Sequence, residues 1–455
     1  MKFTKLALSL TLTWGCASAL AAPPTLPGLP QQPPRQQQPQ TGGDDAAPLP
    51  PPSSAAQKLY SAAKADLLQV RSLLKSGRTQ SSVGSGFLVG TSNLVLTNYH
   101  VVSQFALDPD TYTGEWVDTA GQRGNIELLA VDVLHDLAVV RVNRYGTGVF
   151  NVPEKQVRLT QGQYLYSLGN PLDLGFAISE GSYNGVITRS FYDQLLFTGP
   201  INAGMSGGPS VTADGEVAGV NVSKRLDGEL VSFLVPIRFA QELLQKVKPD
   251  AKPPKDFTAI VAQQLLAHQK AMIDQLLATP LTLKAMGPYE VPVRESEQMR
   301  CWGRSNVKGD KPFSVDVTNC SMETAIFVSG SLQTGQVAIQ HQYMRSTGLD
   351  ALRFSQLSSA SFKNESFGGY KDSRLTGPTC TEQFIKNDTL PMRAVLCVKA
   401  YRKFEGLYDF SLLIGSTDDG LMNLQSRMDA RGVSYENGMR ASRAFLQSLA
   451  RGGKK

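Results

Sequence analysis

Short apolar runs separated by turn residues make up the first half of the chain. Gly84–Gly90 forms a hairpin-like stretch, Leu94–Val102 is an apolar run of β type, and Leu137–Val142 predicts another buried strand. Runs of this length, bounded by glycine, asparagine or aspartate, are typical of strands. The pattern predicts a mainly β region that closes at Pro236–Arg238.

Helical spacing marks both ends of this region. Ala55–Leu67 and Phe239–Val247 are predicted helices. A longer amphipathic helix is predicted from Asp256, a suitable N-cap, to about Ala278, because apolar residues recur at helical spacing and Pro280 stops the pattern. His268 lies in the same apolar stripe, so we expect a packed histidine and not a ligand.

The last part of the chain alternates apolar and polar positions. Phe313–Val317, Thr324–Val328 and Tyr408–Ile414 show this period of two, which predicts an antiparallel sheet. A helical end is expected near Leu421–Ala450. The residues of this part do not indicate its role. Binding a substrate, docking on the preceding β region and attachment to an envelope partner are three candidates that the sequence does not rank.

The N-terminus has the pattern of an export signal. Lys2 and Lys5 precede the apolar run Leu6–Trp14, and Ala19–Ala21 is a small-residue cleavage site, so residues 1–21 predict a signal peptide cut after Ala21. A lipid anchor at Cys16 is disfavoured by the residues before it. Residues 22–54 are rich in proline and glutamine and predict an extended tether. The mature protein is expected to be periplasmic or secreted, without a transmembrane segment.

Length, charge and cysteine content agree with an exported protein of several domains. A chain of 455 residues favours two or three domains, and loss of the two signal lysines takes the formal charge from +6 to +4, which does not argue for nucleic acid. Four cysteines lie outside the signal and allow three connectivities. Turn residues halfway between the members of each pair predict local disulfides of about 3 kcal/mol each, and these join Cys301 to Cys320 and Cys380 to Cys397.

The candidate nucleophile is Ser206, in the hexapeptide Gly204–Pro209. Glycines on both sides permit a tight turn that exposes the hydroxyl. A serine needs a base and an acid that orients it. Among four histidines, His100 lies at the end of the apolar run Leu94–Val102 and is the candidate base. Asp136 directly precedes an apolar strand, where its charge needs a hydrogen-bond donor such as an imidazole N–H, so it is the candidate acid. His135 is expected on the other side of that strand, at the surface.

The combination of these segments resembles the trypsin-like serine peptidases, most closely the bacterial HtrA/Deg branch. The resemblance covers about residues 60–245, and it rests on Gly84–Gly86, Thr97–Val102, Asp136–Val140, Gly169–Pro171 and Ile201–Pro209. It implies two six-stranded β-barrels with the active site in the cleft between them. By position, Ser206 is the nucleophile, His100 the general base and Asp136 its orienting acid, and the N–H groups of Gly204 and Ser206 form the oxyanion hole.

The resemblance also implies a substrate pocket. Pro200 stands where relatives specific for Lys or Arg carry an acidic residue, so cleavage after small or medium aliphatic residues is expected. The backbone of Asn221–Ser223 would pair with an extended polypeptide. The predicted substrate-binding residues are Pro200, Ile201, Asn221, Val222, Ser223, Ser232 and Phe233. Met205 cannot form the ion pair that activates animal zymogens, so local packing or a partner must shape the oxyanion hole.

The predicted organisation has five parts. A signal peptide (1–21) and a linker (22–54) precede an all-β double-barrel protease domain (55–247), a hinge and helix (248–280) and a β-rich α+β domain with disulfides (281–455). No convincing PDZ pattern, His-Glu-x-x-His or Cys-x-x-Cys pairing is present, so neither a metal nor another cofactor is predicted. Two alternatives stay open, an α/β-hydrolase esterase, disfavoured by the order of the three residues, and a catalytically silent barrel that binds peptides or envelope components.

Overall fold

The computed structural model describes residues 53–154, 157–224, 230–248, 250–254, 256–306, 311–363 and 372–452. The described residues belong to one compact unit, Pro52–Lys455. The predicted signal peptide, Cys16 and the linker up to residue 52 lie outside the described residues. Among the described residues, no helix is long and apolar enough to cross a bilayer.

The described chain starts with helix α1 (Ser54–Ala63). The Ser53 hydroxyl caps this helix by accepting from the Ala56 N–H at 3.1 Å, as serine commonly does at an N-cap. The helix is shorter than expected, because the chain turns at residues 64–66 and enters strand β1 at Leu67. The Tyr60 hydroxyl donates to the Phe176 carbonyl and so holds α1 on the predicted protease domain (55–247), which we call the protease part.

The first sheet is antiparallel and has seven strands in the order β5-β4-β1-β2-β3-β7-β6. Its edge strands β5 and β6 are separated in sequence by Ile126 alone, so the sheet must curl until its edges meet. The Ile126 N–H donates to the Gly114 carbonyl at this junction. The expected six-stranded barrel is therefore formed, with one of its strands divided into β5 and β6 at Ile126. Its strands are β1 (Leu67–Leu74), β2 (Gln80–Leu88), β3 (Leu94–Thr97), β4 (Tyr112–Asp118), β5 (Arg123–Asn125), β6 (Glu127–Asp132) and β7 (Leu137–Arg141).

The second sheet is a closed six-stranded barrel in the order β10-β13-β12-β11-β8-β9, as expected. A short 3₁₀ helix, η1 (Pro171–Asp173), follows its first strand, and α3 (Ile237–Gln245) follows its last. Leu168, Val211 and Val220 pack with Phe87 and Leu96 of the first sheet in one hydrophobic core. The barrel strands are β8 (Tyr164–Gly169), β9 (Ala177–Ile187), β10 (Gln194–Thr198), β11 (Pro209–Val211), β12 (Val217–Lys224) and β13 (Ser232–Pro236).

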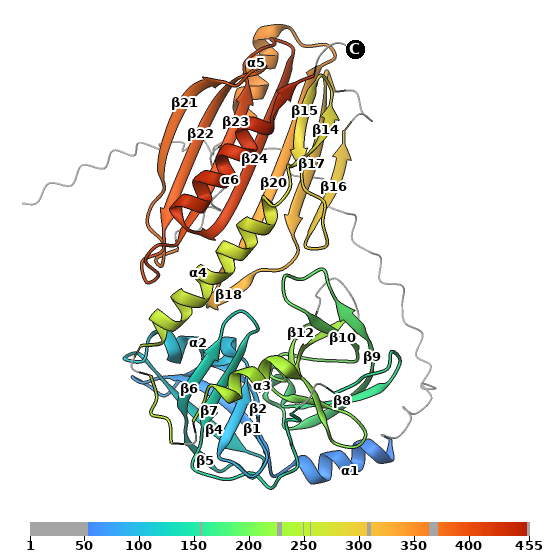
Figure 1. Cartoon of the computed structure of the whole chain (residues 1–455), viewed down its shortest axis with the longest axis vertical. Coiled ribbons are helices and arrows are strands. Elements are labelled where there is room, and N and C mark those ends of the chain that lie inside the picture. Colours follow the sequence, from blue (N-terminus) through green and yellow to red (C-terminus); the bar gives the residue numbers. More distant parts are fainter. Residues whose placement is uncertain are drawn as a thin grey trace, which may run out of the picture. The chain divides into compact units, whose positions relative to one another are not determined.

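Helix α4 (Phe257–Leu276) links the protease part to the rest of the chain (Figure 1). Asp256 caps it by accepting from the Thr258 N–H at 2.8 Å. The Gln264 amide accepts from the Val133 N–H and donates to the Val131 carbonyl, which fastens the helix to the end of β6. His268 is buried on this helix, as predicted.

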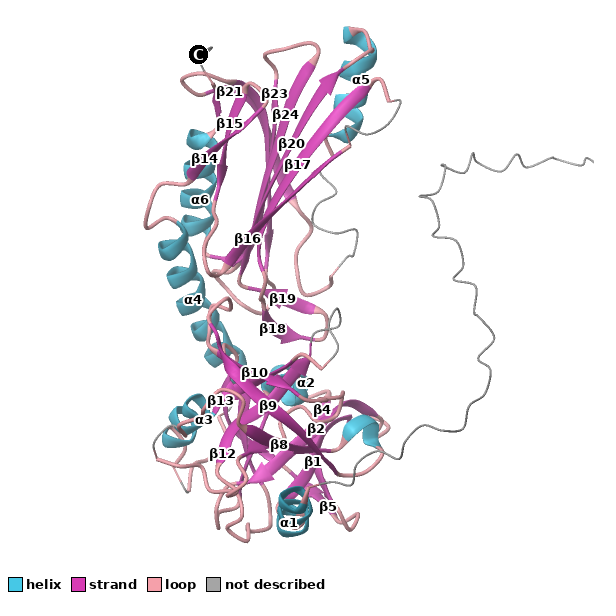
Figure 2. Ribbon diagram, turned by 90° about the vertical axis from the view of Figure 1, so that its right-hand side faces the viewer, coloured by secondary structure: helices cyan, strands magenta, loops and turns pink. Residues whose placement is uncertain are grey.

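The C-terminal part is built on a seven-stranded antiparallel sheet in the order β16-β17-β20-β24-β23-β22-β21. Helices α6 (Tyr435–Ser448) and α5 (Ala351–Ser361) lie on opposite faces of it (Figure 2). The helical end expected from Leu421 is corrected, because residues 422–433 form strand β24 and the helix begins only at Tyr435. The sheet strands are β16 (Met299–Ser305), β17 (Phe313–Met322), β20 (Gln336–Ser346), β21 (Thr379–Lys386), β22 (Pro391–Ala400), β23 (Tyr408–Ser416) and β24 (Met422–Val433).

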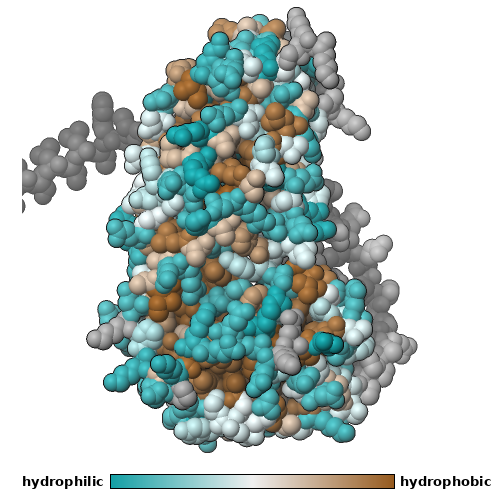
Figure 3. Space-filling view, in the orientation of Figure 1, coloured by the Kyte–Doolittle hydropathy of each residue, from teal (hydrophilic) through white to brown (hydrophobic). Residues whose placement is uncertain are grey.

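Two smaller sheets complete this part. Strands β14 (Thr282–Met286), β15 (Tyr289–Val293) and β25 (Ala450–Arg451) form one, and β18 (Ile326–Ser329) and β19 (Leu332–Thr334) form a hairpin. In the space-filling view, hydrophobic residues gather on the lower half of the face shown, interrupted by hydrophilic ones (Figure 3). The region is β-rich with helices, which agrees with the predicted α+β class.

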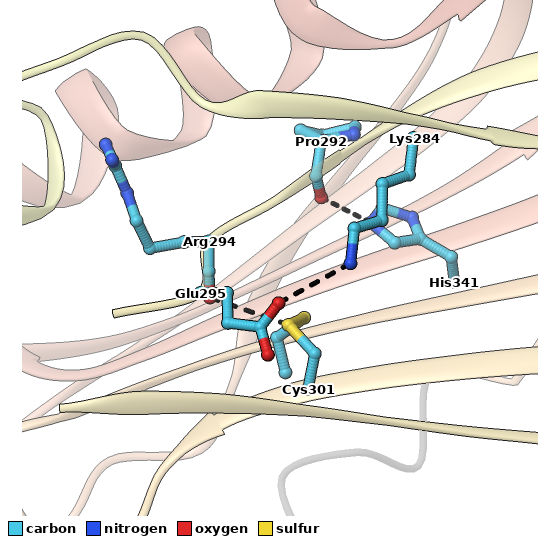
Figure 4. Close-up of a disulfide and its surroundings, with 7 residues drawn as sticks. Lys284, Pro292, Arg294, Glu295, Cys301 and His341 are labelled. Atoms are coloured by element: carbon cyan, nitrogen blue, oxygen red, sulfur yellow. Dashed lines mark hydrogen bonds and ion pairs between the residues drawn. A yellow bond between two sulfur atoms is a disulfide. The ribbon is translucent and has the colours of Figure 1, made fainter. Parts of the chain in front are cut away.

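Both predicted disulfides are confirmed. Cys301 and Cys320 are register partners of β16 and β17, and Cys380 and Cys397 are register partners of β21 and β22. Beside the first disulfide, the fully buried His341 is drawn close to Pro292 (Figure 4). Its Nε2–H donates to the Pro292 carbonyl at 2.7 Å, and its Nδ1 accepts from the Ser426 hydroxyl at 2.8 Å. Burial lowers the pKa of His341 to about 4.

Candidate active site

Ser206 lies on a glycine turn between the barrel residue Ile201 and strand β11. Gly204 and Gly207 have φ of +93° and +87°, a left-handed region that favours glycine. A Cβ atom would lie 2.3 Å from the Asn170 carbonyl oxygen at Gly204 and 2.2 Å from the Ser85 carbonyl oxygen at Gly207. The turn therefore requires the glycines that identified it in the sequence.

Hydrogen bonds and packing hold this turn in place. The Ser85 N–H donates to the Ser206 carbonyl and the Ser85 hydroxyl donates to the Gly204 carbonyl, both at 2.7 Å. Met205 is buried with Ile201 and neighbouring apolar residues of the barrel. Residue 205 is therefore held by apolar packing, at the position where animal zymogens form an ion pair on activation.

His100 lies in the first turn of helix α2 (Tyr99–Leu107), which follows β3 almost directly. Asp136 occupies the tight turn before β7, with φ of +55°. Its Oδ2 lies 2.6 Å from His100 Nδ1, and its Oδ1 accepts from the His100 backbone N–H at 2.8 Å. The carbonyl of Asp136 accepts from the Tyr99 N–H and the Asn98 amide. One aspartate thereby fixes both the ring and the backbone of His100.

Two opposing effects set the charge of His100. Burial lowers the pKa of His100, but the charge of Asp136 and its hydrogen bond raise it by more, so the pKa lies above its usual value. With Nδ1–H directed at the carboxylate, a neutral His100 presents the lone pair of Nε2 on its other side. That is the tautomer a general base requires.

The Ser206 hydroxyl is bonded elsewhere in this structure. It donates to the Val222 carbonyl at 3.1 Å, and no hydrogen bond joins it to His100 within the described part of the chain. His100 and Val222 nevertheless line the same cavity. The structure thus brings His100 and Asp136 into contact. It places Ser206 against Val222 of β12, which lines the same cavity as His100.

Two backbone N–H groups beside Ser206 have no protein acceptor among the described residues, those of Gly204 and Ser206 itself. The Ala203 carbonyl accepts from the Leu172 N–H at 2.7 Å. Because the peptide unit is planar and trans, this bond fixes the direction of the Gly204 N–H opposite to the Ala203 carbonyl. Two amide donors are thereby left for an external acceptor.

The predicted substrate-binding residues fall into four groups. Val222 and Phe233 line the cavity, and Pro200 is exposed. Ile201, Asn221 and Ser232 are buried and support the walls. The Asn221 amide donates to the Leu168 carbonyl, and the Ser232 hydroxyl donates to the Gly199 carbonyl. The Ser223 backbone pairs with Phe233 in β12 and β13, and its side chain lies outside the described set.

A cavity of 480 Å³ opens beside His100. The protease part contributes His100, Leu134, Tyr192 and Val222 to its lining. Residues of the C-terminal part line it as well, among them Thr324, Ile326 and Phe327. Sequence reasoning missed this second group, because nothing along the chain links residues 324–327 to His100.

His135 corrects one expectation. It was expected at the surface, but its side chain is only 13% exposed. Its Nδ1 lies 2.7 Å from Asp132 Oδ2, and its ring stacks on Phe239 at 3.6 Å between centroids. Helix α3 covers the side of the strand on which His135 was expected to meet water. Among the described residues, no group of three or more His, Cys, Asp or Glu side chains could hold a metal ion.

Known proteins similar to this chain match its protease part. A family model for the trypsin-like peptidase domain matches residues 84–220. A relative named a periplasmic DegP-like serine endoprotease, from Pseudomonas fluorescens, is 27% identical over 195 residues, or 41% of this chain and 40% of the relative. A serine protease named HhoB, from Synechocystis, is 30% identical over 177 residues, or 37% of this chain and 41% of the relative.

The chain thus spans about two fifths of the length of these curated relatives. Among solved structures, a serine endoprotease from Yersinia pestis is 23% identical, with a TM-score of 0.36, and covers 43% of this chain and 67% of that one. A protease from M. tuberculosis in its active form is 19% identical, with a TM-score of 0.38, and covers 45% of this chain and 90% of that one.

Proposed function

We propose that this chain, which carries a trypsin-like peptidase domain of the HtrA type, is a serine endopeptidase that cleaves extended or unfolded polypeptides in the periplasm or outside the cell. The observation that carries the proposal is the 2.6 Å contact between His100 Nδ1 and Asp136 Oδ2. The glycine turn adds to this contact, because the N–H groups of Gly204 and Ser206 have no acceptor among the described residues. A histidine oriented by a carboxylate is what a serine nucleophile needs.

In the proposed mechanism, Ser206 attacks the carbonyl carbon of the substrate and its proton moves to Nε2 of His100. The oxyanion of the tetrahedral intermediate accepts from the N–H groups of Gly204 and Ser206. Collapse breaks the peptide bond, His100 gives its proton to the leaving amine, and an acyl-enzyme remains on Ser206. Water, deprotonated by His100, then releases the acid and restores the hydroxyl.

Ser206 must leave the Val222 carbonyl before it can transfer its proton. Rotation about one side-chain bond changes the direction of the hydroxyl, and staggered rotamers of serine interconvert readily. Catalytic hydrogen bonds are often absent or long in free enzymes and form with the substrate. We infer that substrate binding completes the contact between Ser206 and His100.

The strand pairing supports an extended substrate. Strand β11 pairs with β12 only up to Val220. Beyond Asn221, the edge of β12 that faces away from β13 has no strand partner among the described residues. A polypeptide added at this edge would form main-chain hydrogen bonds with Val222–Lys224. Since Pro200 is uncharged and Phe233 lines the cavity, we propose cleavage after small or medium aliphatic residues.

Covalent labelling tests the nucleophile. The protein from Ala22 onward, treated with a fluorophosphonate, should be labelled at Ser206 and should digest casein. The Ser206→Ala variant should lose both properties. Ser81→Ala, which removes an exposed hydroxyl from β2, is the matched control and should retain both. Casein digestion separates the endopeptidase from an esterase, which the probe would also label.

A second candidate is a catalytically silent barrel that binds peptides. The bond from Ser206 to the Val222 carbonyl is the observation that favours it. Absence of labelling at Ser206, together with peptide binding at the open edge of β12, would replace the first proposal with this one.

A further inference from the structure

We propose that the β18–β19 hairpin of the C-terminal part is a wall of the substrate cleft, and that Phe327 determines which side chain is accepted immediately before the cleaved residue. This inference rests on the proposed function and names its substrate preference. It assigns a role in specificity to residues more than a hundred positions beyond the segment 84–220 that matches the peptidase family model.

The hairpin lies directly against the helix that carries the base. The ring of Phe327 meets the ring of His100 edge to face, with 6.0 Å between centroids. The hydroxyl of the neighbouring Tyr99 donates to the Val328 carbonyl at 2.8 Å. Phe327 and Ile326 also line the 480 Å³ cavity beside His100. This volume is within the range of about 300–1,000 Å³ found for ligand pockets.

The geometry of an extended chain identifies the substrate position. Successive side chains of a strand point to opposite sides. In a substrate paired with β12, the side chain of the cleaved residue would enter the side of this cavity that Phe233 borders. The preceding side chain then points the other way, toward His100. Phe327 is the apolar side chain from the C-terminal part that meets the His100 ring.

Contacts with α2 and with other residues of the C-terminal part hold the hairpin in place. Val328 and Leu332 belong to a hydrophobic core that also contains Val101 and Val102 of α2 and Tyr401. The Thr334 and Tyr401 hydroxyls are 2.7 Å apart, and the Arg374 guanidinium donates to the Ser329 carbonyl. A wall anchored at both strands excludes side chains by shape. A lid that opened freely would not discriminate between them.

The ratio of kcat/KM values between two peptides measures selectivity and tests this role. Fluorogenic peptides with valine at the cleaved position would carry alanine, valine, leucine or phenylalanine just before it. Phe327→Ala enlarges the space beside His100, so the ratio of kcat/KM for phenylalanine over alanine should rise by about tenfold or more, the discrimination expected of an apolar pocket that changes in size. Phe327→Leu, which preserves packing better, should shift the ratio in the same direction by less.

Phe384→Ala is the matched control, because Phe384 is an exposed aromatic of β21, with 74% of its surface accessible. It should leave all four kcat/KM values unchanged. Equal ratios in the wild type, both Phe327 variants and the control would overturn the proposal. A uniform rise for every peptide in Phe327→Ala would also overturn it and make the hairpin a lid.

A binding measurement separates this inference from the proposed activity. In the Ser206→Ala background, the affinities of the same peptides by fluorescence anisotropy should show the shift in selectivity when Phe327→Ala is added. Suppose that the fluorophosphonate fails to label the wild type but the binding shift occurs. The role of Phe327 in selectivity is then supported and the endopeptidase proposal is contradicted. If labelling succeeds and binding selectivity does not change, only the proposed role of Phe327 is contradicted.

Discussion

At the scale of single residues, Asp136 does more than orient a ring. Its two carboxylate oxygens contact the side chain and the backbone of His100, and its carbonyl accepts from Asn98 and Tyr99. The positive φ of Asp136 directs all three oxygens at one segment. Non-glycine residues in this conformation are uncommon and are often maintained by a functional constraint.

The raised pKa of His100 predicts the pH dependence of activity. A general base must be neutral, so kcat/KM should rise with pH through a midpoint above about 6.5, the usual histidine value. Asp136→Asn removes the charge that raises this pKa, so the midpoint should fall and kcat should drop by about 10³–10⁴-fold. Rates measured from about pH 5 to 9 check both statements.

Glu127→Gln is the control for this experiment, because Glu127 is an acidic residue of β6 that pairs with Arg141 at the surface. Its profile should match that of the wild type. A flat profile in the wild type between about pH 5 and 8 would contradict the assignment of His100 as the base.

At the scale of elements, helix α2 joins the two parts of the molecule. It carries His100 in its first turn, and it packs against β18 of the C-terminal part. Val101 and Val102 are buried with Val328 and Leu332 in one core. Lys403 donates to the Leu107 carbonyl at the other end of the helix. The position of His100 therefore depends on contacts made by two distant stretches of chain.

Tyr99→Phe tests this dependence. The substitution removes the buried hydrogen bond to the Val328 carbonyl and leaves that acceptor without its donor. The free energy of unfolding should fall by about 1–3 kcal/mol. Urea denaturation measures the change. Tyr145→Phe, which alters a tyrosine that is 71% exposed, should leave the free energy of unfolding unchanged. An equal effect of both variants would show that the contact carries no stability.

At the scale of the whole molecule, the predicted boundaries near 247 and 280 separate parts that fold into one compact unit. Helix α4 contributes Val261 and Leu265 to the core shared with the first sheet and the β18–β19 hairpin, and Met272 and Ile273 to the core of the C-terminal part. The boundaries stay a proposal. The shared core explains how the C-terminal part can border the candidate active site.

Buried neutral histidines in this unit predict sensitivity to acid. Burial lowers the pKa of His341 to about 4, below the value in an unfolded chain. Between these two values the unfolded state binds the additional proton, so stability falls as the pH drops. From about pH 6.5 to 4 the wild type should lose about 3 kcal/mol more than His341→Gln.

Denaturation at several pH values measures this difference, because the other titrating groups are common to both proteins. Ser426→Ala retains the imidazole and should keep the acid dependence of the wild type. Parallel stability curves for the wild type and His341→Gln would refute the role of His341.

The local features of this protein follow from its sequence. The glycine turn around Ser206, helix α4 and both disulfides depend on short-range pattern: backbone conformations that only glycine adopts, apolar periodicity, and turns between paired cysteines. The two barrels were implied only by the resemblance to the trypsin-like peptidases. Local pattern was wrong at residues 422–433, where strand pairing with β20 and β23 overrode helical spacing. It was also wrong at His135, which α3 covers.

Only folding determines how the two sheets curl and what surrounds the candidate active site. Curling depends on hydrogen bonds between strands distant in sequence, which periodicity does not encode. The approach of Phe327 to His100 joins residues 227 positions apart and results from packing of α4 and the β18–β19 hairpin around one shared core. No local propensity specifies such a contact, because its free energy comes from burying surfaces that meet only after folding.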